Sequence, residues 1–252
     1  MDELSLAVWA AICGVAVLAG FVKGAVGFAM PTIMISLLGS VLPPDRALAA
    51  LILPTLCANG WQALRGGLPG ALASARLHWR FIAMVMIFIA LSAQMVSLLP
   101  TRVLYLVLGG PIILFALVQL AGWTLRIAPQ WRGRAELGIG AFAGAIGGVS
   151  GVWGPPTVMY LTALETPKVE HIRVQGVVYG LGAVMLLGAH VRSGILNAET
   201  LPLSLFMLVP AGIGLMLGFL AQDRLDQVRF KRMTLIVLVL AGANLLRRGL
   251  LG

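Results

Sequence analysis

Apolar runs separated by short polar or Gly/Pro-rich connections follow one another along the whole chain. Many of these runs approach the roughly 20 residues that a helix needs to cross a bilayer. The pattern predicts an all-α polytopic membrane protein with loops at about 65–80 and 126–134. The expected helices lie at about residues 4–21, 26–41, 46–64, 80–98, 102–123, 135–149, 155–165, 172–191, 200–221 and 229–247.

The composition agrees with this pattern, because 60% of the 252 residues are hydrophobic and only 11% are charged. The formal net charge of +9 comes from Lys and Arg in short connections, which is typical of cytoplasmic loops. No basic run with interleaved aromatic residues suggests nucleic-acid binding. We therefore expect a cell inner (plasma) membrane protein whose partners are the lipid bilayer and a small anionic substrate. A homodimer is compatible with the sequence.

The second half of the chain repeats the first. Gly20, Gly24 and Gly27 match Gly144, Gly148 and Gly151 at an offset of 124 residues, and Pro31-Thr32 matches Pro156-Thr157 at 125. Several Arg and Gly positions further along match at 127. We therefore predict a first transmembrane repeat at 1–125, a linker at 126–134 and a second repeat at 135–252, each with about five helices.

An odd number of crossings per repeat would place the second repeat upside down. If every expected helix crosses, thirteen Lys and Arg lie on one side and five on the other. The positive-inside rule then makes the first side, with the 126–134 linker, cytoplasmic and both termini external. Ten short spans are the preferred arrangement, and six spans with two re-entrant hairpins are the alternative.

Two Gly-rich segments interrupt the apolar pattern at matching places in the two halves, at 20–32 and 144–157. Gly and Pro weaken a helix interior, and broken backbone inside a membrane survives only where protein or a water-filled cavity surrounds it. Paired breaks of this kind point to a transporter substrate site. The alternative is that each glycine only lets two helices pack closely.

The paired Gly-rich segments ending in Pro31-Thr32 and Pro156-Thr157, the length and the two-fold repeat resemble the TauE/SafE sulfite exporter family, also called TSUP transporters. The resemblance covers nearly the whole chain. It implies a secondary transporter of small sulfur-containing anions, such as sulfite, sulfoacetate or related organosulfonates, most often an exporter. Uptake of another small anion and a membrane assembly subunit that transports nothing are the alternatives.

The predicted substrate site combines the two breaks with uncharged polar stripes on neighbouring helices. The stripes hold Asn59 and Gln62 in one half, and Gln175 and Tyr179 in the other, while Arg173 opens a helix. Ordinary interhelical hydrogen bonding and interfacial anchoring are the alternatives for these side chains. No arrangement of catalytic residues, metal ligands or cofactor-binding motifs is evident, so no enzyme activity is expected. The predicted substrate-binding residues are Gly24, Gly27, Pro31, Thr32, Asn59, Gln62, Gly148, Ser150, Gly151, Gly154, Pro156, Thr157, Arg173, Gln175 and Tyr179.

Overall fold

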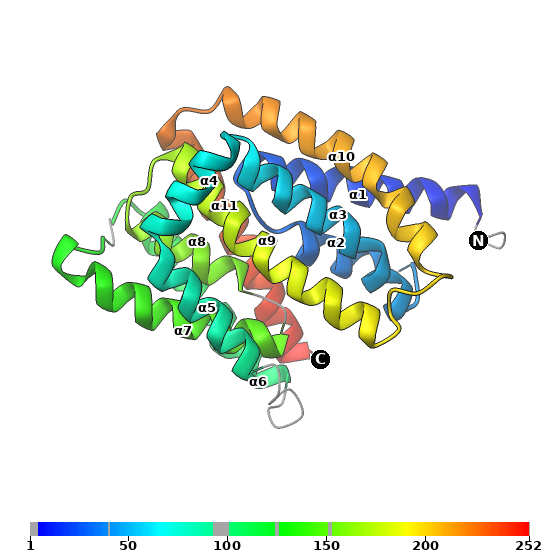
Figure 1. The fold of residues 1–252 in the computed structure, drawn as a ribbon, viewed down its shortest axis with the longest axis horizontal. Coiled ribbons are helices and arrows are strands. Elements are labelled where there is room, and N and C mark those ends of the chain that lie inside the picture. The colour runs from blue at the N-terminus through cyan, green and yellow to red at the C-terminus, as the bar shows by residue number, and fades with distance from the viewer. Residues whose placement is uncertain (1–4, 40, 93–100, 124–125, 151–152, 252) are drawn as a thin grey trace.

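The computed structural model describes residues 5–39, 41–92, 101–123, 126–150 and 153–251, and within them the fold is helical (Figure 1). The prediction of an all-α polytopic membrane protein is confirmed. The elements are α1 Leu6–Val26, α2 Met30–Leu38, α3 Pro44–Leu64, α4 Gly67–Leu77, α5 Trp79–Ser92, α6 Thr101–Leu120, η2 Pro129–Trp131, α7 Arg132–Ser150, α8 Gly154–Ala163, α9 Lys168–Arg192, α10 Leu201–Asp223 and α11 Gln227–Leu251.

The predicted loop at 65–80 is wrong, because α4 occupies Gly67–Leu77 and meets α5 at a bend of 79°. Pro69 lies in the first turn of α4, where its missing N–H costs no hydrogen bond. The alanines that follow favour a helix, and α4 buries Ala71 and Ser74. The glycines and charges in this stretch concealed the helix in the sequence.

The helices that follow the two breaks are too short to cross a membrane. At 1.5 Å per residue, the nine residues of α2 and the ten of α8 span only about 14 and 15 Å, roughly half of a 30 Å bilayer core. The preferred arrangement of ten complete spans is therefore wrong. Five described helices, α1, α3, α9, α10 and α11, are long and apolar enough to cross, and the number rises to six if the bent α4–α5 pair forms one span.

Each short helix turns back beside the helix before it. The backbone N–H of Ile127, just before α7, donates to the carbonyl of Ala163 at the end of α8, so α7 begins and α8 ends at the same end of the molecule. Correspondingly, α2 packs against α1 and leads to the start of α3. The α1–α2 and α7–α8 hairpins open toward opposite ends of the molecule (Figure 1).

Glycines set the main helix contacts. A Cβ at Gly20 of α1 would collide with the Ala211 carbonyl oxygen of α10, and one at Gly144 of α7 would collide with the Val85 carbonyl oxygen of α5. The α1–α10 and α5–α7 pairs both run parallel. The α3–α9 contact at Gly176 and the α6–α11 contact at Gly242 are antiparallel. For Gly20 and Gly144, close packing therefore accounts for the glycine.

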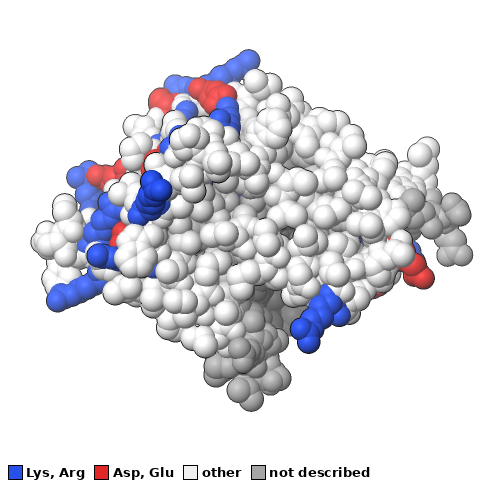
Figure 2. Space-filling model, in the orientation of Figure 1, with Lys and Arg blue, Asp and Glu red and all other residues white. Residues whose placement is uncertain are grey.

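Charged residues collect at the two ends of the molecule and leave a broad uncharged belt between them (Figure 2). The more basic end, on the left of the view, lies where α4 and α9 begin and α10 ends, and we call it the basic end. Large apolar side chains such as Leu114, Val209 and Leu240 are exposed on the belt. Lipid tails are the environment that such a surface requires. The chain is a multi-pass membrane protein.

Candidate functional site

The two breaks line one cavity, which we call the central cavity. The empty space in it, including the part that is open to solvent, is about 650 Å³. Pro31 and Pro155 lie in the first turns of α2 and α8, so the N-terminal ends of both short helices face the same space. The lining residues are Lys23, Phe28, Ala29, Pro31, Thr32, Leu51, Thr55, Asn59, Trp153, Gly154, Pro155, Tyr179, Ala183, Leu186 and Ala241.

An unusual backbone conformation forms the first break. Gly27 ends α1 with φ = 88°, and its N–H donates to the Lys23 carbonyl at 2.8 Å. Ala29, directly before α2, also has a left-handed φ of 73°. This conformation costs a residue with a Cβ about 1–2 kcal/mol, so surrounding contacts must hold it. The chain thereby reverses direction within three residues and presents the start of α2 to the cavity.

Lys23 is the basic residue that lines the central cavity. Helix α1 continues past the predicted end at residue 21, so Lys23 lies inside the helix, with only 2% of its surface exposed. Its Nζ donates to the Gly27 carbonyl at 2.9 Å and to Asn59 Oδ1, and it lies 4.9 Å from the centre of the Tyr179 ring. None of the described residues lining the cavity carries a carboxylate. The lysine therefore has polar partners but no described counter-ion.

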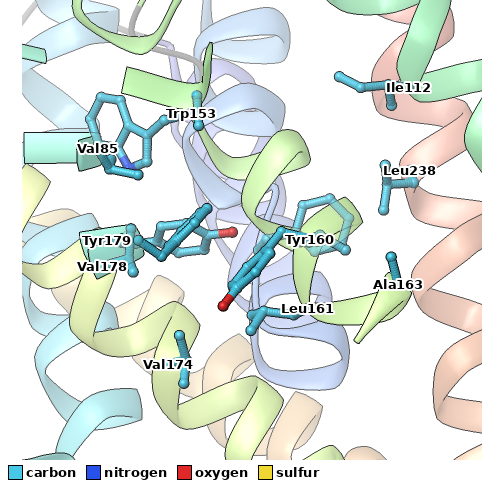
Figure 3. Packing of buried hydrophobic residues seen from close by; sticks show 14 of the residues in the cluster. Val85, Ile112, Trp153, Tyr160, Leu161, Ala163, Val174, Val178, Tyr179 and Leu238 are labelled. Carbon is cyan, nitrogen blue, oxygen red and sulfur yellow. The ribbon is translucent and has the colours of Figure 1, made fainter. Parts of the chain in front are cut away.

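Asn59 and Tyr179 connect the two breaks. Asn59 accepts from Lys23 and donates through Nδ2 to the Tyr179 carbonyl at 3.2 Å, while the Tyr179 hydroxyl donates to the Gly154 carbonyl at 2.9 Å. The side chains of Tyr179 and Trp153 belong to the apolar cluster shown in Figure 3. Thr55 Oγ1 is buried in the cavity wall without a hydrogen-bond partner among the described residues, so it can serve a ligand.

The central cavity adjoins a wider space that we call the vestibule, whose empty space, open mouth included, is about 1130 Å³. The two share Pro31, Thr32, Leu51, Thr55, Ala183 and Leu186. The vestibule extends to His190, Asn244 and Arg248, near the ends of α9 and α11. Because these helix ends lie away from the basic end, the cavity is approached from the opposite side.

Five of the predicted site residues line the central cavity: Pro31, Thr32, Asn59, Gly154 and Tyr179. Gly27 and Gln175 are not among the lining residues, but the Gly27 carbonyl accepts from Lys23, and a Cβ on Gly27 would collide with Gln175 Oε1. Gln62 Nε2 donates to the Ile172 carbonyl at 2.6 Å and to Gln175 Oε1 at 3.3 Å. These two glutamines form a polar layer beside the cavity.

The other predicted residues lie elsewhere. Gly24 faces Leu215 and Gly218 of α10. Pro156 and Thr157 are buried in the first turn of α8, where the Thr157 hydroxyl donates at 2.9 Å to the carbonyl of Trp153, the residue just before the helix. Arg173 lies in a separate pocket at the basic end. Gly148 and Ser150 belong to α7, but their surroundings, like Gly151 itself, lie outside the described residues.

The sequence places Lys23 in the first broken segment, either to recruit anions or to mark the cytoplasmic end, and leaves it out of the predicted site residues. A lysine within an apolar run is itself a signal of function. Sequence reasoning missed a second feature. A buried polar cluster also joins α4, α7 and α8: Tyr160 Oη lies 3.0 Å from His78 Nδ1 and donates to Glu136 Oε1 at 3.2 Å, and Arg132 Nε donates to the same carboxylate at 2.9 Å. Within the described part of the chain, no group of three or more His, Cys, Asp or Glu could hold a metal ion.

Comparison with curated proteins and with solved structures gives no significant match. A family model described as "Sulfite exporter TauE/SafE" matches residues 12–245, which is nearly the whole chain. The chain therefore belongs to the TauE/SafE sulfite exporter family.

Proposed function

We propose that this protein is a secondary transporter that binds small sulfur-containing anions in the central cavity, beside Lys23, and exports them. The proposed cargo is sulfite, sulfoacetate or a related organosulfonate. The family description supports the sulfur oxyanion and the direction of transport. The buried lysine supports the negative charge of the cargo.

Lys23 supports the binding of an anion, because an ionised group that is removed from water is costly unless it is paired. In the central cavity, Lys23 meets a carbonyl, an amide oxygen and an aromatic ring, all of which favour a cation without neutralising it. A bound anion would supply the missing charge. Intramembrane ionisable residues that face a cavity are functional candidates for this reason.

The two short helices supply further binding groups. Helix N-termini carry unpaired backbone N–H groups and a partial positive charge, which favour anions. Both α2 and α8 begin at the cavity wall, from opposite sides. Thr32 and Thr55 add hydroxyl groups that can donate to oxygen atoms of a sulfite or sulfonate.

The pattern of helix pairs supports an inverted repeat as the transport scaffold. In such a repeat, α1 would correspond to α7 and α10 to α5, so the parallel α1–α10 pair would correspond to the parallel α7–α5 pair. In the α3–α9 and α6–α11 pairs, each helix would pack against its own counterpart in the other repeat. Repeats related in this way move against each other around a fixed site in many transporters. We assign the basic end to the cytoplasm and the vestibule to the exterior.

The test is anion flux into liposomes that contain the purified chain alone. Sulfite, sulfoacetate and taurine are compared under imposed proton and sodium gradients. Saturable, protein-dependent flux of sulfite or sulfoacetate is expected. Flux of none of the three anions by correctly folded protein would favour the assembly-subunit alternative. Transport confined to taurine, which carries a positive as well as a negative group, would contradict the assignment of the cargo as a net anion.

A further inference from the structure

We infer that the chain holds a second oxyanion-binding site at the basic end, in a pocket between α3, α9 and α10 whose empty space, open mouth included, is about 620 Å³. We call it the basic pocket. The inference rests on the proposed function, because the transported anion would bind at this site before it moves to the central cavity. The lining residues are Gln62, Arg65, Gly66, Lys168, Val169, Ile172, Arg173, Gln222 and Asp223.

The first observation is an unused hydrogen-bond donor. Gln222 is 3% exposed, and its Oε1 accepts from Arg65 Nη1 at 2.6 Å. This bond determines which end of the amide is the nitrogen. Gln222 Nε2 has no hydrogen-bond partner among the described residues, and a buried donor left in this state is costly. An acceptor atom in the basic pocket would satisfy it.

The second observation is the charge of the pocket. Three cationic residues line it, and Asp223 is the only described lining residue with a carboxylate. Asp223 pairs with Arg65, and Arg173 pairs with Glu170 of the same helix at 3.2 Å. Lys168 Nζ donates to the carbonyls of Gln222 and Leu225, at 3.0 and 2.6 Å, and so has no carboxylate partner among the described residues.

Together these groups suit a small oxyanion. Guanidinium groups recognise the oxygen atoms of sulfite, sulfonate and phosphate alike. The pocket also lies where α9 begins, so the positive end of that helix dipole adds to the charge of Lys168. The same chemistry would accept the phosphate of an anionic lipid headgroup, and the test below separates the two sources.

The polar layer of Gln62 and Gln175 separates this pocket from the central cavity. Gln62 lines the basic pocket and donates to Gln175 Oε1, which lies against Gly27. The Gly27 carbonyl in turn accepts from Lys23. Gln62 Oε1 and Gln175 Nε2 are both buried without partners among the described residues. The layer therefore retains one acceptor and one donor that an anion or its water could use in passing from the pocket to Lys23.

The experiment measures equilibrium binding of radiolabelled sulfite to the full-length chain in nanodiscs of neutral lipid. The Lys23→Met variant removes the central charge, so the binding that remains reports the basic pocket. Adding Gln222→Glu to that variant should weaken the remaining binding by about tenfold or more, because a carboxylate of the same size replaces the donor. Arg173→Gln should act in the same direction. Arg224→Gln, an exposed residue that does not line the pocket, is the matched control and should bind normally.

No remaining binding in Lys23→Met would overturn the second site, and so would remaining binding that neither Gln222→Glu nor Arg173→Gln changes. Competition by phosphatidylglycerol in the nanodisc would support the site and identify the lipid as a source of its oxyanion. Failure of the proposed function has a different signature. In that case Lys23→Met would leave total binding unchanged, whatever the basic pocket does.

Discussion

Lys23 on α1 donates a hydrogen bond to Asn59 on α3. Asn59 also binds the backbone of Tyr179, so it connects Lys23 to α9. Asn59 is 3% exposed, and its amide uses both ends, since Oδ1 accepts from Lys23 and Nδ2 donates to the Tyr179 carbonyl. Because the Asn59 amide is neutral, the proposed function requires a bound anion to balance a charge on Lys23. A carboxylate at position 59 would balance that charge in place of a ligand.

Asn59→Asp should abolish sulfite flux while the protein remains folded, because a carboxylate beside Lys23 would replace the anion as its counter-ion. Asn59→Leu should also lower flux, since it leaves the Tyr179 carbonyl without its donor. Asn197→Asp, an exposed change in the turn before α10, is the control for added charge. Sulfite flux in liposomes measures the effect. Wild-type flux in Asn59→Asp would mean that the transported anion is not the counter-ion of Lys23.

Gly20→Val should prevent folding or strongly lower the yield of monodisperse protein, because the α1–α10 contact has no room for a Cβ at this position. Gly14→Val, on the same helix, meets nothing within 4 Å and should be tolerated. Size-exclusion chromatography of both variants measures the difference. Equal yields would mean that the close approach of α1 and α10 does not support the fold.

Tyr160→Phe should lower the free energy of unfolding by about 1–3 kcal/mol, because it leaves the buried His78 and Glu136 side chains without a shared partner. The Phe81–Tyr160 stacking, with ring centroids 4.2 Å apart, should survive the change. Denaturant unfolding in detergent measures the loss. Flux per folded molecule should stay close to that of the wild type, and a variant that is stable but inactive would assign this cluster to transport.

Cysteine labelling should place Gly133 in the cytoplasm and Glu199 outside the cell, because they lie at opposite ends of the helices on either side of the uncharged belt. Cys13 and Cys57 are replaced first, and a membrane-impermeant reagent is applied to intact cells. Only Glu199→Cys should react before lysis. The reverse pattern would mean that the vestibule opens to the cytoplasm, and labelling of both positions would contradict the topology.

The apolar runs were sufficient to predict most helices, since a helix that spans the membrane needs a continuous run of mostly apolar residues. They did not predict α4, because Gly66, Gly67 and Pro69 gave its start the pattern of a loop. The Gly/Pro breaks also located the segments that line the central cavity. The short lengths of α2 and α8 were harder to predict, because apolar residues continue along the chain beyond the end of each helix.

The arrangement of the site depended on contacts between helices that no local pattern contains. Arg173 and Gln175 are two positions apart, which separates them by roughly 200° around a helix, so they could not share one pocket. Gln175 and Tyr179, four apart, do face the same side. The role that we propose for Lys23 depends on the close approach of α3 and α9. That approach depends on Gly176, where a side chain would collide with the backbone of Ala63.

Sulfite flux by the Lys23→Met variant shows whether Lys23 binds the transported anion. Lys231→Met, in the first turns of α11 and away from the central cavity, removes the same charge as a control. We expect Lys23→Met to lower flux by about tenfold or more at equal amounts of folded protein, while Lys231→Met transports normally. Flux in Lys23→Met equal to that of the wild type would mean that Lys23 does not bind the transported anion.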